Sequence, residues 1–301
     1  MSTPSSPTLL VTGASGQLGG AVVRHLLDTL KVPAERLIVT TRSPDGLADL
    51  AARGVTVRAA DFDQPDSLVA AFAGADRLLL VSTDALMEPG KRLTQHRAAV
   101  QAAVDAGVKH VVYTSLPSAD TSHVSFAPDH WGTEQALSAS TLGWTILRNA
   151  WYFENLAYSV PGALTSGEWA TAAGEGRIAY IARDDLARAA AAALASDSNE
   201  NQVLTLTGEQ AWSARDVASR VSALTGKPLA VLDITQEQLI GGLTAHGFPP
   251  VLADVFASFD AATAAGDLGA VTDDYARLTG QSPTTLDAWL QANVDLLTKA
   301  H

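Results

Sequence analysis

Short apolar runs rich in β-branched residues alternate with longer amphipathic stretches through the first half of the chain. Most of these runs lack regular polar positions, as strands do when a parallel sheet is covered on both faces. Repeated strand–helix units of this kind predict an α/β fold with a doubly wound parallel sheet and right-handed crossovers. The runs that predict strands span residues 9–12, 37–40, 55–57, 78–81, 111–113 and 145–147.

Glycines mark where most of the intervening helices should end. A glycine just after a helix can adopt the left-handed conformation that closes the last turn. Gly54, Gly74, Gly107 and Gly143 each stand between a helical stretch and the next apolar run, so we expect all four in that role. The helical stretches span residues 18–30, 45–53, 65–72, 92–106 and 133–140.

The second half of the chain has a different, mostly helical pattern. The glycine-punctuated segment 162–176 predicts a loop with a short strand, and the Ala-rich segment 184–195 predicts a helix. We expect the C-terminal helices to cover the carboxyl edge of the sheet, because such sheets bind ligands there. Further strand candidates lie at 203–206 and 229–234, a helix should begin at Pro249–Pro250, and the last helix should begin at 284–287.

Composition excludes several classes of function. The formal net charge of −12 disfavours phosphate backbones and anionic membranes, so we expect neither nucleic acid nor membrane as a partner. The chain has no Cys, which removes disulfides, thiolate catalysis and Cys-ligated metals, so redox chemistry would need a bound cofactor. Its seven His include no His-x-x-x-His pair, and no metal site is expected. Residues 1–7 lack the features of a signal peptide, so a cytoplasmic protein is expected.

A glycine motif, Thr-Gly-Ala-Ser-Gly-Gln-Leu-Gly at residues 12–19, follows the first predicted strand and opens the first helix. Gly13 permits a tight turn, Gly16 lets a phosphate approach the backbone, and Gly19 lets helix and strand touch. Free N–H groups and the positive helix end would then face a pyrophosphate. A tight turn with no ligand is the alternative. This motif makes the predicted sheet Rossmann-type, with phosphate contacts from Gly13, Ser15, Gly16, Gln17 and Leu18.

The end of the second strand bears on which dinucleotide binds. NAD sites usually place an Asp or Glu about 20 residues beyond the glycines, where it holds the ribose 2′-hydroxyl. This chain instead reads Thr40-Thr41-Arg42-Ser43. A guanidinium can donate two hydrogen bonds to a 2′-phosphate, so NADP(H) is preferred over NAD(H). The alternative is that Arg42 only faces solvent at a strand end.

Other strand ends would lie along the same cofactor. Asp61 and Phe62 follow the third strand and could place an amide and an apolar ring against adenine. Asp63 is better explained as the N-cap of the helix that begins near Pro65. The ends of the fourth and fifth strands add Ser82, Thr83, Asp84, Thr114 and Ser115.

Three segments, residues 12–19, 106–115 and 147–152, resemble the NmrA-like atypical short-chain dehydrogenase/reductases. The likeness runs over about residues 8–296; the bacterial type 2 NAD(P)H:quinone oxidoreductases are most similar, and triphenylmethane dye reductases are also similar. The resemblance implies that Asn149, Trp151 and Tyr152 border the nicotinamide and the substrate. It also implies a cofactor contact for Arg183, whose alternative is a surface charge at a helix start. One departure is Gln135, where relatives often carry Lys.

The predicted division of the chain follows from these assignments. An NADP-binding Rossmann domain should comprise residues 1–155, with 180–207 returning to its sheet. A smaller, mostly helical substrate-covering lobe should comprise residues 156–179 and 208–301. Apolar helices offer a candidate homodimer face, although no segment marks one.

The proton relay of orthodox short-chain dehydrogenases is missing. Those enzymes use a Tyr with a Lys four residues on, and none of the five Tyr here has one. No Lys occurs between Lys109 and Lys227. Ordinary ketone reduction is therefore disfavoured. Quinones and cationic dyes remain possible, because their reduced forms are stabilised by delocalisation and depend less on a general acid. His130 and Glu134, at i and i+4, could handle protons together, or could be an ordinary helix His and its neighbour.

The leading hypothesis is an NADPH-dependent oxidoreductase that transfers hydride to a quinone or similar conjugated small molecule. Its candidate catalytic residues are Tyr152, His130 and Asn149. A non-catalytic sensor of NADP(H) is the alternative from another class, because the missing relay suits it equally. Within enzymes, reduction of dyes, aldehydes, imines or conjugated alkenes stays open.

Overall fold

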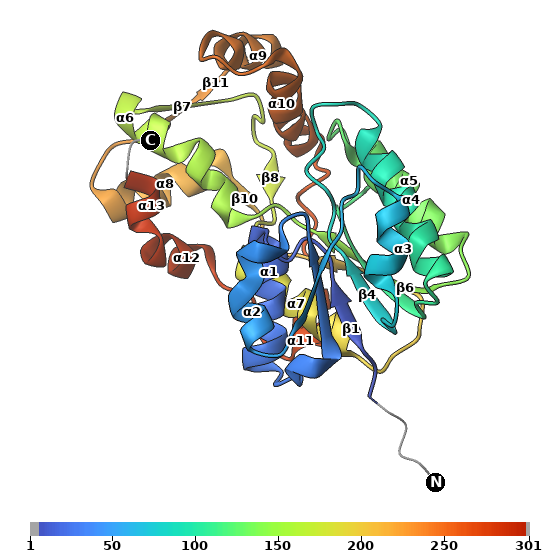
Figure 1. The fold of residues 1–301 in the computed structure, drawn as a ribbon. Coiled ribbons are helices and arrows are strands. Elements are labelled where there is room, and N and C mark those ends of the chain that lie inside the picture. The colour runs from blue at the N-terminus through green and yellow to red at the C-terminus, as the bar shows by residue number, and fades with distance from the viewer. Residues whose placement is uncertain (1–5, 299–301) are drawn as a thin grey trace. The chain divides into compact units, whose positions relative to one another are not determined.

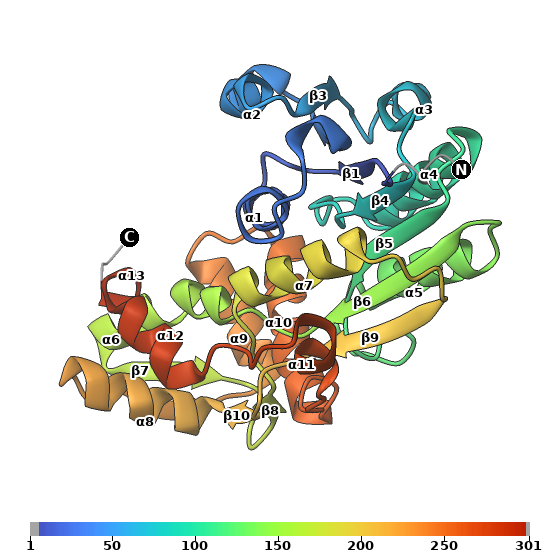
Figure 2. The same cartoon turned by 90° about the horizontal axis from the view of Figure 1, so that it is seen from below.

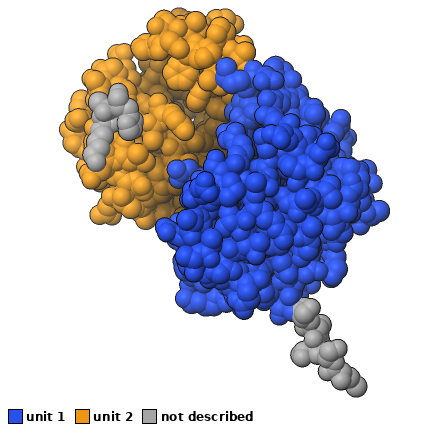
Figure 3. Space-filling view, in the orientation of Figure 1, with its two compact units in different colours: residues 1–115, 129–148, 186–204 blue, residues 116–128, 149–185, 205–301 orange. Residues whose placement is uncertain are grey.

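The computed structural model describes residues 6–298 and divides them between two compact units (Figure 3). Residues 1–5, part of the segment that was expected not to be a signal peptide, lie outside the described part. Unit 1 comprises Met1–Ser115, Asp129–Arg148 and Leu186–Leu204, and unit 2 comprises Leu116–Pro128, Asn149–Asp185 and Thr205–His301. None of the helices within residues 6–298 is long and apolar enough to cross a membrane.

The central sheet has seven strands in the order β3-β2-β1-β4-β5-β6-β9 (Figure 1). Neighbouring strands from β3 to β6 pair in parallel. This arrangement confirms the predicted doubly wound Rossmann-type fold. The strands are β1 (Leu9–Val11), β2 (Leu37–Thr41), β3 (Thr56–Ala59), β4 (Arg77–Leu80), β5 (His110–Ser115), β6 (Gly143–Asn149) and β9 (Gln202–Leu206).

Helices cover both faces of this sheet. Figure 2 shows α1, α2 and α7 on one side and α3, α4 and α5 on the other. Phe72 of α3 and Tyr113 of β5 are among the largest side chains buried in the layer between α3–α5 and the sheet. The helices are α1 (Gln17–Arg24), α2 (Ala48–Ala52), α3 (Asp66–Phe72), α4 (Lys91–Asp105), α5 (Ala127–Ser138) and α7 (Arg183–Ala195), and a π-helical turn, His25–Thr29, extends α1.

Unit 2 is mostly helical and carries two small sheets. In it β7 (Glu168–Thr171) pairs in parallel with β11 (Ala230–Asp233), and β8 (Arg177–Ile178) pairs antiparallel with β10 (Trp212–Ser213). One of its apolar clusters contains Phe153, Tyr180 and Trp289. The helices are the 3₁₀-helix η4 (Phe153–Tyr158), α6 (Val160–Ser166), α8 (Ala214–Thr225), α9 (Gln236–Ala245), α10 (Pro250–Ala265), α11 (Asp274–Thr279), α12 (Leu286–Ala292) and α13 (Val294–Thr298).

The structure corrects several local predictions. Gly143 does not end a helix: it begins β6, where a Cβ would lie 2.7 Å from His110 Nδ1, so close packing explains this glycine. Part of the predicted loop at 162–176 is α6, because its sequence Val-Pro-Gly-Ala-Leu buries an apolar face. The helix expected from residue 133 begins at Ala127, and α13 follows the helix expected to be last.

Two glycines allow a paired test of this packing. A Cβ on Gly19 would lie 2.3 Å from Gly13 O, whereas Gly162, within α6, has no atom within 4 Å of its added Cβ. We expect Gly19→Ala to lower the free energy of unfolding by about 1–3 kcal/mol. Gly162→Ala should raise it by about 0.5–1 kcal/mol, because Ala loses less entropy in a helix. Urea unfolding of both variants measures the difference, and equal effects would contradict it.

Candidate dinucleotide site

The glycine loop leaves its backbone open to solvent. Gly13 has a φ of +61°, and Gly13, Ser15, Gly16 and Gln17 are all exposed. No side chain caps the start of α1, and its first turn contains no acidic residue. The N–H groups and the positive end of α1 are therefore available to an anion.

Buried hydrogen bonds hold this loop from below. Ala14 donates its backbone N–H to Thr40 O at 3.0 Å. Thr12 donates its hydroxyl to Leu79 O at 3.1 Å and accepts the Val81 N–H at 2.9 Å. The loop is thus fixed to the neighbouring strands while its outer face stays open.

Thr41 connects the glycine loop to the end of β2. Its Oγ1 lies 2.9 Å from Ser15 Oγ and accepts the Ser43 N–H at 3.2 Å. Arg42 is exposed between them, and its positive charge helps to lower the pKa of the Asp63 carboxyl. The exposed guanidinium can be reached by a ligand anion.

The loops after β3 and β4 are fixed to each other through α4. Gln95 donates to Asp63 Oδ1 at 2.8 Å and accepts the Thr83 hydroxyl at 2.6 Å. The Gln95 amide, and then Lys91, lower the pKa of the Asp63 carboxyl. The prediction that Asp63 caps a helix is therefore wrong: Pro65 occupies the N-cap of α3, and Asp63 faces α4.

The remaining predicted residues of unit 1 lie at these same strand ends. Asp61 accepts the Asp63 N–H at 3.0 Å and so closes its turn, and Phe62 packs partly against the core. Thr114 accepts the Ser82 N–H at 2.9 Å, which joins the ends of β4 and β5. Asp84 is exposed in the loop after β4.

A buried histidine network supports the loop after β4. His96 Nε2 accepts the Thr83 N–H at 3.0 Å, so the proton of the ring is on Nδ1, which lies 3.0 Å from Thr133 Oγ1. Tyr113 Oη lies 2.8 Å from His130 Nδ1 and 3.3 Å from His96 Nδ1. Burial lowers the pKa of His96 to about 3 and that of His130 well below its ordinary value. Both rings are therefore neutral near pH 7.

Glu134 binds other partners than His130. Its carboxylate accepts two hydrogen bonds from Arg148, at 3.0 and 2.6 Å, and one from Ser115 Oγ at 2.6 Å. Glu134 is 3% exposed, and its partners end β5 and lie on β6. The group therefore ties α5 to the carboxyl ends of two strands. A catalytic role for His130 stays a prediction.

A second group of predicted residues lies in unit 2. Asn149, at the end of β6, is 7% exposed, and its Oδ1 is buried without a hydrogen-bond partner in the described structure. The Arg183 guanidinium lies 5.6 Å from the centre of the Tyr152 ring. Trp151 packs against Phe259, with ring centres 4.1 Å apart. An unsatisfied buried acceptor is costly, so Asn149 Oδ1 calls for a donor from a ligand.

The supporting groups Thr12, Thr41, Gln95 and His96 were missed from sequence. Each is a polar residue on an otherwise ordinary strand or helix, and its partner lies far along the chain. One signal was available, because Thr41 sits between the apolar β2 run and Arg42. Within residues 6–298 no group of three or more His, Asp or Glu side chains could hold a metal ion.

An open glycine loop at the first strand–helix junction of a doubly wound parallel sheet defines the class of Rossmann-type dinucleotide-binding proteins. The chain belongs to the NmrA-like family, whose model matches residues 5–290. This membership confirms the resemblance noted in the three sequence segments.

Its relatives include reductases. The chain is 38% identical over 278 residues to quinone oxidoreductase 2 of Escherichia coli, covering 92% of this chain and 96% of the relative. It is 33% identical over 287 residues to the NAD(P)H azoreductase of Xenophilus azovorans, covering 95% and 97%. The crystal structure of an NADPH-dependent quinone oxidoreductase from Escherichia coli, complexed with NADPH, superposes with a TM-score of 0.90 at 37% identity, covering 95% of this chain and 99% of that one.

Buried histidines predict a pH dependence of stability. Burial lowers the pKa of His96 to about 3 and of His110 to about 4, from an ordinary 6.5. Below pH 6.5 the unfolded chain binds protons that the folded chain does not, so stability falls as the pH is lowered. Each such histidine contributes a slope of up to about 1.4 kcal/mol per pH unit.

Urea unfolding between pH 6.5 and 5 measures this slope. We expect His110→Gln to lower this slope by up to about 1.4 kcal/mol per pH unit, because the variant lacks one histidine that only the unfolded chain protonates. An unchanged slope would show that the folded and unfolded states protonate His110 equally.

Proposed function

We propose that this protein is an NADPH-dependent oxidoreductase that transfers hydride to a quinone or a similar conjugated small molecule. The observation that carries the proposal is the open loop from Gly13 to Gln17, which Thr41 links to the end of β2, where Arg42 is exposed. Membership of a family whose relatives include a quinone oxidoreductase and an azoreductase supports the choice of acceptor.

The residues present fit NADP(H). The close approach of Gly19 to Gly13 O, which a Cβ would block, keeps the start of α1 against the loop where a pyrophosphate would bind. Arg42 would hold the 2′-phosphate, and Asn149 Oδ1 would accept a hydrogen bond from the nicotinamide carboxamide. The full set proposed for the cofactor is Gly13, Ser15, Gly16, Gln17, Leu18, Arg42, Asp61, Phe62, Ser82, Thr83, Asp84, Thr114, Ser115, Asn149, Trp151 and Arg183.

When bound, NADPH supplies the hydride. Tyr152, held by the Arg183 guanidinium over its ring, would orient the acceptor, and the adjoining rings of Trp151 and Phe259 would offer it an apolar surface. Positioning of this kind supplies most of the rate when little proton transfer is needed. The oxyanion of a reduced quinone is delocalised and can take its proton from water.

The protonation and hydrogen bonding of the polar groups in unit 1 support a conjugated acceptor. His96 and His130 are neutral and buried, and Glu134 is engaged by Arg148 and Ser115. Neither histidine can serve as an imidazolium donor near neutral pH. An isolated ketone, whose alkoxide needs a strong acid, is therefore a poor substrate on this proposal.

We further propose that the protein acts in the cytoplasm, without nucleic acid as a partner. The net charge of −12 supports the second point. Two functional domains, a nucleotide-binding part and a substrate-covering lobe, and assembly as a homodimer remain predictions.

Loss of NADPH absorbance over time tests the proposed activity. The purified protein should oxidise NADPH only when an acceptor is added, faster with quinones and azo dyes than with aldehydes. A run without acceptor is the control. Tight NADPH binding with no turnover on any acceptor would contradict the enzyme and favour a sensor of NADP(H).

Arg42→Ala tests the choice of cofactor. We expect the Kd for NADPH to rise about 10- to 100-fold, because a charge-assisted hydrogen bond to the 2′-phosphate is lost, with little change for NADH. Arg53→Ala is the matched control, since Arg53 is an exposed arginine paired with Asp28. Calorimetric titration measures the Kd for both variants. An equal rise in Kd for NADPH and NADH would show that Arg42 does not contact the 2′-phosphate.

A further inference from the structure

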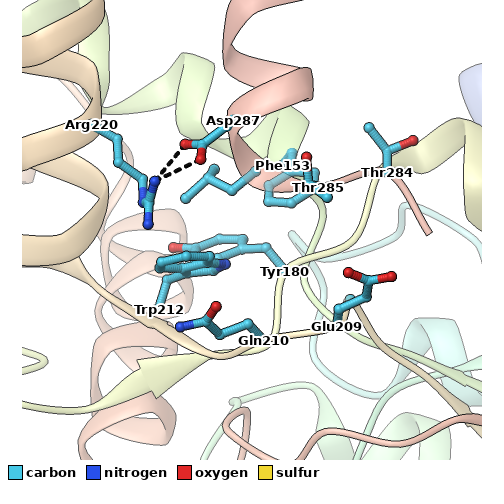
Figure 4. Close-up of a pocket in the computed structure, with 11 residues that line it drawn as sticks. Phe153, Tyr180, Glu209, Gln210, Trp212, Arg220, Thr284, Thr285 and Asp287 are labelled. Carbon is cyan, nitrogen blue, oxygen red and sulfur yellow. Dashed lines mark hydrogen bonds and ion pairs between the residues drawn. The ribbon is translucent and has the colours of Figure 1, made fainter. Parts of the chain in front are cut away.

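Unit 2 contains a pocket of about 370 Å³ that no residue of the proposed cofactor set lines (Figure 4). Aromatic side chains form one part of its wall, and charged or hydroxyl side chains form the other. The lining residues are Phe153, Tyr180, Gly208, Glu209, Gln210, Trp212, Arg220, Thr284, Thr285, Leu286 and Asp287.

The pocket lies on the opposite face of a short bridge from Tyr152. Tyr152 and Ile181 pair as a parallel bridge. Successive side chains along extended backbone point to opposite faces. Phe153 and Tyr180, the neighbours of this pair, stack 5.9 Å apart and line the pocket, whereas the Tyr152 ring meets Arg183. The pocket is therefore separated from Tyr152, and no residue of the proposed cofactor set lines it.

The hydroxyl of Tyr180 is available to a ligand. Tyr180 is 7% exposed and lines the pocket, and its hydroxyl makes no hydrogen bond with any residue in the range 6–298. Burial, and then Asp260, raise the pKa of Tyr180, so the hydroxyl keeps its proton. It can therefore donate a hydrogen bond to an acceptor bound in the pocket.

The charges of the pocket disfavour an anionic ligand. Arg220 stacks 4.2 Å above the Trp212 ring and donates to both oxygens of Asp287 at 2.7 Å, so these two charges offset each other. Glu209 adds a further negative charge at the exposed rim. The ring of Trp212 and the phenolic donor of Tyr180 then favour a flat, uncharged ring.

We propose that this pocket is a second ligand site, which binds an uncharged planar aromatic molecule carrying a carbonyl. The carbonyl accepts the hydrogen bond of Tyr180, and the ring lies against Trp212 on the side that Arg220 does not cover. Gln210 and Glu209 at the rim accept hydrogen bonds from any N–H or O–H of the ligand. Binding requires no redox step and is independent of the dinucleotide.

Benzamide is a suitable probe because it is flat, uncharged and not reduced by NADPH. Its binding to the full chain is measured by saturation-transfer NMR, with and without saturating NADPH. We expect binding that NADPH leaves unchanged. Tyr180→Phe should weaken it about 3- to 10-fold, the effect of one uncharged hydrogen bond. Tyr158→Phe is the matched control, because Tyr158 is exposed and lies outside the pocket.

Thermal unfolding separates a ligand site from simple packing. Tyr180→Phe removes a hydroxyl that makes no hydrogen bond within residues 6–298, so its Tm should stay close to that of the parent. Thr284→Phe fills the pocket from its wall and should abolish binding even if Tyr180→Phe proves hard to interpret. Displacement of benzamide by NADPH, or equal binding by the parent, Tyr180→Phe and Thr284→Phe, would overturn the proposal.

Discussion

The carboxylate of Glu134 is the interaction on which the chemistry of unit 1 depends. It binds Arg148 through two hydrogen bonds and Ser115 through a third, and it is almost fully buried. A buried carboxylate requires such partners, since loss of one leaves an uncompensated charge. The same hydrogen bonds fix α5 against the ends of β5 and β6. The Glu134 carboxylate therefore has a structural role at this edge of the sheet.

His96 and His130 are also engaged in hydrogen bonds, but as neutral rings. His96 Nε2 accepts the hydrogen bond of the Thr83 N–H, and His130 Nδ1 is hydrogen-bonded with the Tyr113 hydroxyl. Burial keeps both rings neutral. Side chains here therefore hold backbone loops in place, and their protons are not available near neutral pH. Such a site suits an acceptor whose reduced form is stabilised by conjugation, and it relies on a bound dinucleotide for the redox step.

Sequence patterns predicted the parts of this structure that local physics determines. The apolar runs located all six strands from β1 to β6, and the glycine motif located the loop after Val11. The failures involve contacts between distant residues. Asp63 turned toward Gln95 of α4, Gly143 packed against His110, and the polar residues Thr41 and His96 gained their roles only from partners far along the chain. The hydrophobic pattern of one segment does not identify a partner in a distant segment.

On the proposed function, no side chain acts as a strong acid toward the acceptor. Comparison of 1,4-benzoquinone with cyclohexanone, a ring of the same size that lacks conjugation, as acceptors for the NADPH-loaded protein tests this point. We expect steady reduction of benzoquinone and no reduction of cyclohexanone above the rate without protein. Comparable turnover of the two would mean that a side chain does donate a proton to the acceptor.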